Sequence, residues 1–175
     1  MGIYATYYAI PKAQIEEVKK DNDIGFDSEK LFSDISCDLG KMWDILHYLL
    51  TNQNSYDIVL NNDSDNVFHQ AIYGVECLNQ NEVILNENAE PLIYIKVDDV
   101  LRIADKLSTI DTNVLFQNFD TNNFLKNNIY PEIWEDINIS EIAEIRLEAV
   151  SCFNKLKDFY RQTAEDSKLV TVCMG

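Results

Sequence analysis

DLGKMWDILHYLLT, residues 38–51, is the stretch that says most about how this chain folds. Successive residues of an α-helix are rotated by about 100° around its axis. At that rotation the apolar residues of the stretch fill one continuous arc: Met42, Trp43, Ile45, Leu46, Leu49 and Leu50. The arc is wider than the apolar stripe of a surface helix, so we predict that the stretch is a helix placed deep in the core.

The polar residues at the border of this arc are the first candidates for a functional site. His47 lies at the edge beside Trp43, one helical turn away, and Asp44 and Thr51 follow round the other side of the helix. A histidine in such a position more often packs with its ring nitrogens hydrogen-bonded, but it can also line a cleft and bind a ligand. Both interpretations of His47 stay open at the level of the sequence.

A second aromatic segment, IYPEIW at residues 129–134, can complete a pocket at this edge. Pro131 disfavours a helical conformation of the residue before it, so we predict a rigid, extended turn. An aromatic floor beside a titratable imidazole is typical of small-molecule pockets. The alternative is that both tryptophans serve only in packing, in the core or as a lid. The predicted candidate cleft consists of Trp43, Asp44, His47, Thr51, Tyr130 and Trp134.

The segments before and after residues 38–51 indicate further strands and helices. Residues 3–10 and 169–174 are apolar and rich in aromatic or β-branched side chains, which indicates strands, and a first and a last strand often pair in one sheet. Shorter strands are expected at residues 83–85 and 92–97. Further helices are expected at residues 11–20, after Ser28, at 65–73 before Gly74 and from a cap at Asp98. Two short helical pieces are expected next, around residues 114–119 and, after a cap at Asp120, to about residue 126. The longest helix is expected from a cap at Ser140 to about residue 164.

These elements together predict a mixed α/β (α+β) fold. A small central β-sheet is expected to include the N- and C-terminal strands and to be surrounded by several helices. The chain has 175 residues, enough for one domain with a core but not comfortably for two, and no linker or repeat divides it. We therefore predict a single domain over residues 1–175.

The charge of the chain is its most unusual property. Thirty acidic residues against fourteen basic ones give 14 − 30 = −16 at pH 7, and the sequence pI is about 4.3. A surface this negative repels phosphate backbones and anionic lipids, so neither nucleic acid nor a membrane is an expected partner. It favours a basic protein as partner, although solubility alone also explains such a charge.

The residues that metal and nucleophilic chemistry need are sparse. The two histidines fall in separate predicted helices, too few for a zinc site, and His69 is expected at the surface because no acid or cysteine lies at ligand spacing from it. There is no glycine-rich phosphate loop and no nucleophile-elbow pattern. No two of the four cysteines have the spacing of a zinc or redox motif, so we expect reduced, mostly buried thiols. No metal and no cofactor is predicted.

Several short motifs occur in order along nearly the whole chain. They are MG before the aromatic-rich first strand, LGKMWDILHYLLT at residues 39–51, AIYGxxxL at 71–78, a strand–helix unit at 94–107, IYPxxW at 129–134 and VTVCMG at 170–175. In these motifs the chain resembles the YfbM-like family, a bacterial domain of unknown function (1877). The resemblance implies a three-layer or mixed α/β fold with helices around a small sheet. It implies no activity and no catalytic residues.

Two functions from different classes follow. The first is a non-enzymatic binding or interaction protein, such as an immunity-type partner of a basic protein. The alternative is a small-molecule binder or modest enzyme that uses a cleft beside Trp43 and His47. The sequence shows no export signal and no apolar run of the roughly 18 residues that would span a bilayer, so a cytoplasmic location is expected. The oligomeric state stays open.

Overall fold

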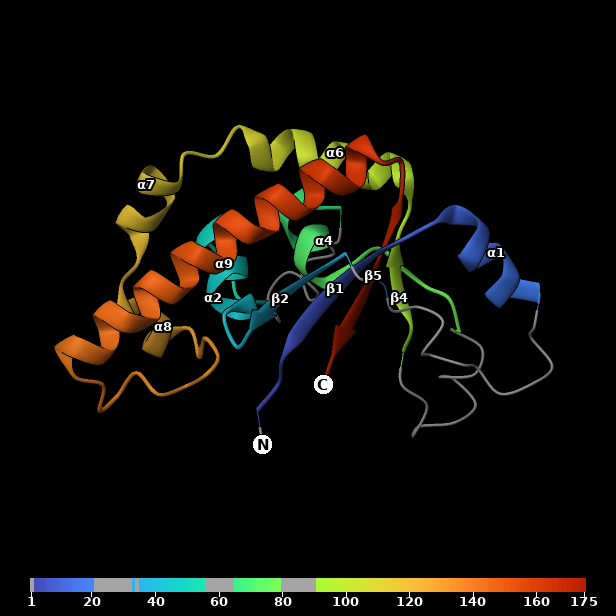
Figure 1. The fold of residues 1–175 in the computed structure, drawn as a ribbon. Coiled ribbons are helices and arrows are strands. Elements are labelled where there is room, and N and C mark those ends of the chain that lie inside the picture. Colours follow the sequence, from blue (N-terminus) through green and yellow to red (C-terminus); the bar gives the residue numbers. More distant parts are fainter. Residues whose placement is uncertain (1, 21–32, 34, 56–64, 80–90) are drawn as a thin grey trace.

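The first and last strands expected from the sequence lie side by side in one sheet (Figure 1). The computed structural model describes residues 2–20, 33, 35–55, 65–79 and 91–175. Within these residues the strands are β1 (Ala5–Ile10), β2 (Ser36–Gly40), β3 (Glu76–Cys77), β4 (Ile93–Ile95) and β5 (Leu169–Met174). The helices are α1 (Lys12–Lys20), α2 (Trp43–Thr51), α4 (Val67–Tyr73), α6 (Val97–Ser108), α7 (Thr112–Leu115), the 3₁₀ turn η2 (Phe116–Asn118), α8 (Thr121–Lys126) and α9 (Ile139–Glu165).

The sheet has the strand order β2-β1-β5-β4-β3, and every pair of neighbouring strands is antiparallel. β5, the last of these strands in the sequence, is therefore the central one. In the pairing of β1 with β5, Ala5 lies opposite Met174 and Ile10 lies opposite Leu169. The predicted mixed α+β fold, with the first and last strands in one sheet, is confirmed.

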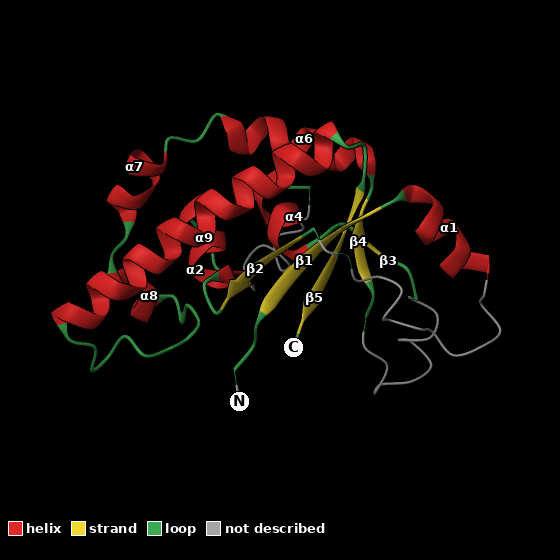
Figure 2. Cartoon of the chain, viewed as in Figure 1, coloured by secondary structure: helices red, strands yellow, loops and turns green. Residues whose placement is uncertain are grey.

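The two faces of the sheet are covered unequally, with α2, α4, α6 and α9 on one side and α1 apart from them (Figure 2). Side chains of a strand alternate between the two faces. Ala5, Tyr7 and Ala9 of β1 belong to the large core beneath the four helices. Ile10 instead joins a small apolar cluster that includes Ile15 of α1. Most of the apolar burial thus lies between the sheet and its helical side.

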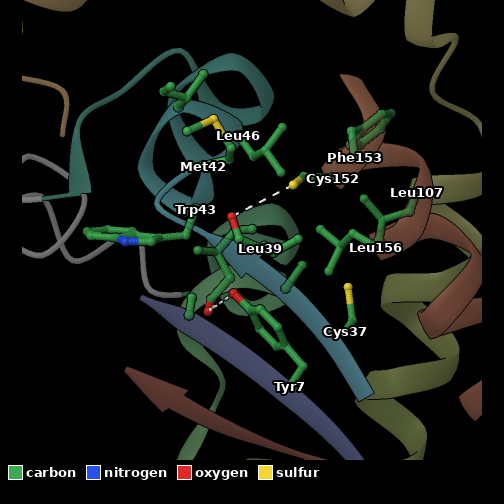
Figure 3. Close-up of a cluster of buried hydrophobic side chains, with 14 of the residues drawn as sticks. Tyr7, Cys37, Leu39, Met42, Trp43, Leu46, Leu107, Cys152, Phe153 and Leu156 are labelled. Atoms are coloured by element: carbon green, nitrogen blue, oxygen red, sulfur yellow. Dashed lines mark hydrogen bonds between the residues drawn. The ribbon is translucent and has the colours of Figure 1, made fainter. Parts of the chain in front are cut away.

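Buried hydroxyl groups connect the layers of the large core. The Tyr7 hydroxyl donates a hydrogen bond to the Ile72 carbonyl at 2.8 Å, and the Tyr160 hydroxyl donates to the Ala71 carbonyl at 2.7 Å. These bonds tie β1 and α9 to the same turn of α4. Figure 3 shows that Trp43, although it belongs to this core, extends away from the side chains of α9.

The prediction that residues 38–51 form one helix is wrong at its beginning. The first three of these residues belong to β2, and α2 starts at Trp43. The chain turns at Gly40, whose φ of +53° favours glycine. The Asp38 carboxylate accepts a hydrogen bond from the Gly40 backbone N–H at 2.7 Å and stabilises this turn. The remaining residues form the buried helix that the apolar arc predicts.

Two other helices begin at different residues from those predicted. Lys96, not Asp98, occupies the cap position of α6. At α9 the Asn138 side chain accepts a hydrogen bond from the Glu141 N–H, and the Glu141 carboxylate accepts one from the Asn138 N–H. This reciprocal capping box starts α9 before Ser140, which therefore lies inside the helix. The strand expected at residues 83–85 and the helix expected after Ser28 lie outside the described residues.

Candidate functional site

The structure brings Trp43, Asp44 and Tyr130 together. The Trp43 and Tyr130 rings are stacked, with centroids 5.6 Å apart and planes 19° from parallel. The Asp44 carboxylate accepts a hydrogen bond from the Tyr130 backbone N–H at 2.9 Å. Asp44 and Trp43 are successive residues of α2, so the helix fixes the turn at residues 129–134 through one polar and one aromatic contact.

Residues before β1 cover this aromatic pair. The Trp43 indole N–H donates to the Ile3 carbonyl at 3.1 Å, and the Ile3 N–H donates to the Tyr130 hydroxyl at 2.9 Å. A Cβ atom at Gly2 would lie 2.6 Å from both the Lys41 Cε and the Tyr130 hydroxyl oxygen, so the backbone passes very close to the pair. Trp43 is consequently only 7% exposed and does not form an open aromatic floor.

His47 is fully buried and faces a second histidine. Its Nε2 lies 3.0 Å from Nδ1 of His69, which lies on α4. The expectation that His69 is a surface residue is wrong: it is buried, because α4 packs against α2 and directs this side chain at His47. The Tyr73 ring stacks on His69 and meets both His47 and Trp43 edge to face. Tyr73 therefore joins the histidine pair to the Trp43–Tyr130 pair.

Burial changes the titration of both polar residues on this face of α2. Burial, followed by the neighbouring His69, lowers the pKa of His47 from 6.5 to about 3, so this imidazole is neutral at pH 7. Burial raises the pKa of Asp44 from 3.8 to about 6; the hydrogen bond from Tyr130 opposes this rise and the charge of Glu132 adds to it. The 3.0 Å contact of the histidines requires one ring nitrogen to donate and the other to accept.

Two polar atoms of this cluster lack partners. Asp44 Oδ1 and His47 Nδ1 are both buried and neither has a hydrogen bond. The residues are three apart on α2, so their side chains leave neighbouring points of the helix surface. An unsatisfied buried polar atom costs on the order of 1–3 kcal/mol. A carboxyl group that titrates near pH 6 beside a neutral imidazole can accept and release a proton close to neutral pH.

The other two residues of the predicted cleft serve elsewhere. The Thr51 hydroxyl donates to the His47 carbonyl at 2.8 Å and accepts from the Gln53 N–H at 3.2 Å, so it closes the end of α2. Trp134 packs against Phe124 with ring centroids 5.0 Å apart, in the aromatic group around α8. The structure therefore gathers Trp43, Asp44, His47 and Tyr130 in one cluster, which Thr51 and Trp134 do not join.

Sequence reasoning missed His69 and Tyr73 as members of this cluster. The i, i+4 spacing of these two residues places them on one side of α4, and this is the signal that could have found them. The spacing could not reveal which helix they face. A hollow of about 490 Å³ was also missed; it is bordered by Tyr73, Gly74, Val75, Glu76, Cys77 and Ile93 at the β3 edge of the sheet. Tyr73 is the residue that the hollow shares with the cluster.

Metal ligation has little to build on in the part of the chain that the structure describes. There, no three histidine, cysteine or acidic side chains gather in a way that could hold a metal ion. All four cysteines are free, with Cys37 and Cys152 buried. Burial raises the pKa of the Cys37 thiol to about 12, with the nearby Cys152 as a further cause. None of the described helices is long and apolar enough to cross a membrane.

Comparison with known proteins yields a family and a fold. The profile of the family described as Domain of unknown function (DUF1877) matches residues 1–173. A crystal structure of the protein of unknown function YfbM from Escherichia coli is similar, with a TM-score of 0.72 and 18% sequence identity over 98% of this chain and 99% of that chain. At this identity the likeness concerns the fold alone. No curated protein sequence matches the chain.

Proposed function

Because the chain belongs to the DUF1877 family, whose domain has no assigned function, its relatives supply no activity, and we propose from its own surface that it is a non-enzymatic interaction protein for a basic partner. Its likeness to YfbM concerns the fold and likewise supplies no activity. We place this role in the cytoplasm as part of the same proposal. An immunity-type protein, which masks the basic surface of another protein, is the form of this role that the charge favours.

The observation that carries the proposal is the position of the negative charge. Among the described residues Asp44 is the only buried acid, so the other described carboxylates lie at or near the surface. With a net charge of −16, the field of this surface attracts cationic proteins and speeds their association. The same field repels anionic polymers and anionic membranes.

An affinity experiment tests the proposal. The tagged protein is used as bait in extracts of its native host, with an unrelated acidic protein of equal net charge as control bait. We expect a basic protein that binds this chain and not the control, and whose affinity falls as salt shortens the Debye length from about 10 Å at 0.1 M towards about 3 Å at 1 M. Recovery of no basic partner, or of partners shared with the control bait, would contradict the proposal.

A second candidate function, small-molecule binding or modest catalysis beside Trp43 and His47, is favoured by one observation. Asp44 Oδ1 and His47 Nδ1 are buried and lack hydrogen-bond partners. A bound molecule could satisfy both atoms if it placed a donor at Asp44 Oδ1 and, at His47 Nδ1, the group that complements the tautomer of this ring. The covering residues before β1 would have to move aside to admit it, and this need makes the second function the weaker candidate.

Thermal-shift measurements against a set of polar metabolites test this second function. A true ligand raises the melting temperature of the native protein and of a surface control such as Asp105→Asn, but has a much smaller effect on Asp44→Asn and His47→Gln. A set in which no compound shifts the native protein, or shifts all four proteins equally, would exclude a site at these atoms.

A further inference from the structure

The first part of α9 carries large apolar side chains that face solvent. Ile139 is 87% exposed and Leu147 is 71% exposed, the two highest values among the large apolar side chains of the described residues. Figure 1 shows that this end of α9 lies near α8, at the opposite end of the helix from β5. The feature therefore lies at the end of α9 that does not lead into the sheet.

These side chains form a regular stripe. Residues four apart lie on one side of a helix, and Ile139, Ala143 and Leu147 follow that spacing, all three exposed. The inner side of α9 is occupied separately, by residues such as Ala149 and Phe153 that are fully buried in the core. The outer stripe thus contributes little to the packing of this fold.

Acidic residues border the stripe. Residues 132–148 hold six acids and one base, a net charge of 1 − 6 = −5. The base, Arg146, donates a hydrogen bond to the Phe116 carbonyl at 3.1 Å. Glu144 and Glu148 lie three and one residues from Leu147 and are exposed beside it. Two copies of this face would repel each other, whereas a face with lysines or arginines around an apolar centre would complement it.

We infer that the outer face of α9, defined by Ile139, Ala143, Leu147, Glu144 and Glu148, is the docking surface for a basic protein that inserts apolar side chains between its cationic groups. This inference rests on the proposed function and localises it. The apolar stripe supplies the desolvated centre of the interface, and the two glutamates supply its charged rim. Affinity comes mainly from the stripe, and the salt dependence comes from the rim.

Site-specific photo-crosslinking in the native host tests the location. Leu147→p-benzoyl-L-phenylalanine places the reactive group on the α9 face, and the same substitution at Leu101, 48% exposed on α6, is the control. We expect one basic protein to be captured from position 147 and not from position 101. Capture of an acidic protein, or of a second copy of this chain, from position 147 would overturn the inference.

Binding measurements with the captured, purified protein complete the test. The double variant Leu147→Ser/Glu144→Lys is compared with Leu101→Ser/Asp105→Lys, which makes the same kinds of change on α6. We expect the α9 variant to bind at least about tenfold more weakly and the α6 variant less than about twofold more weakly. All four positions are exposed, so both variants should keep the native circular dichroism spectrum.

The outcomes separate the location from the role. If a basic partner binds the α9 variant as tightly as it binds the native protein, the inference fails and the proposed function stands. If no basic partner is captured from either position or by the tagged protein, the proposed function is wrong. The inference depends on that function, so it is then wrong too.

Discussion

Asp44 and His47 respond to pH in opposite directions, although they are three residues apart. The raised pKa of Asp44 favours its protonated form in the folded protein, so its contribution to stability is fully present below pH 4 and is lost as pH rises through about 6. The lowered pKa of His47 favours its neutral form, so its contribution is present above pH 6.5 and is lost as pH falls towards 3. Because the pKa of His47 departs further from its ordinary value, the histidine dominates, and stability is expected to fall on acidification.

The variant Asp44→Asn tests how the Asp44 carboxylate contributes to the pH dependence of stability. The amide oxygen can still accept the Tyr130 N–H, and the charge is gone. The free energy of unfolding of the variant minus that of the native protein should rise by about 2–3 kcal/mol as pH increases from 4 to 7, because the native protein loses the contribution of Asp44 over this range. Urea denaturation at several pH values measures this difference. The exposed Asp105→Asn is the control, and a difference that stays constant with pH for Asp44→Asn would mean that this carboxyl group is not perturbed.

Residue identities in the cluster were only partly predictable. The apolar arc correctly predicted that Met42, Ile45 and Leu46 are buried, because helical periodicity reports which sides of a helix are apolar. Whether a residue at the edge of the arc is buried depends on which other segment packs against it. His47 is buried because another helix places His69 opposite it, and no spacing within either helix encodes that meeting.

At the scale of elements, Gly74 controls the junction between α4 and β3. Its φ is +80°, and a Cβ atom there would lie 2.2 Å from the Ile93 Cγ2 on the neighbouring strand. Gly74→Ala should therefore lower the free energy of unfolding by more than about 2 kcal/mol, since strain and a clash add together. Gly40→Ala is the matched control: its φ is +53° but no atom lies within 4 Å of the added Cβ, so about 1 kcal/mol is expected. Chemical denaturation measures both losses. Equal losses in the two variants would mean that the added Cβ at position 74 does not clash with Ile93.

The start of α9 provides a second test at this scale. Asn138→Ala removes the side chain that accepts the Glu141 N–H, and we expect a loss of about 1 kcal/mol in the free energy of unfolding. Ser140→Ala, two residues inside the helix, should change it by less than about 0.5 kcal/mol, because alanine is a good helix former. A larger loss for the serine variant would show that the helix begins at Ser140 after all.

Elements with strong local signals were predicted well, and the short strands β2 and β3 were not. The capping aspartate of α8, Asp120, and the glycine after α4, Gly74, lie where the sequence predicts. β2 was missed because it has only five residues and leads directly into an apolar helix. β3 has two residues and exists through its pairing with β4, which a single sequence does not display.

At the scale of the whole molecule, the net charge of −16 should limit stability at low ionic strength. Like charges on one surface repel, and unfolding moves them apart. Salt shortens the Debye length from about 10 Å at 0.1 M to about 3 Å at 1 M, so the melting temperature should rise as sodium chloride is added. Differential scanning calorimetry measures it, with a neutral protein of similar size as control. A melting temperature that falls with salt would mean that ion pairs outweigh repulsion.

The fold as a whole was predictable to the level of class. Hydrophobic patterning identified the outer segments as strands and placed them in one sheet, which the pairing of β1 with β5 confirms. The strand order was out of reach, because the order of strands in a sheet is decided by contacts between segments far apart in the chain.

The central position of β5 has a consequence for how the protein is made. Translation delivers β1, β2, β3 and β4 before β5, yet β5 is the strand that joins β1 to β4. While the ribosome is still adding α9, the nascent chain therefore holds two separate strand pairs, and β1 and β4 each present an unpaired edge. Open edges of this kind recruit other strands, so newly made chains should depend on chaperones until β5 has been synthesised. Ribosome-bound chains stalled before residue 169 should bind a holdase chaperone, and chains released with β5 in place should not.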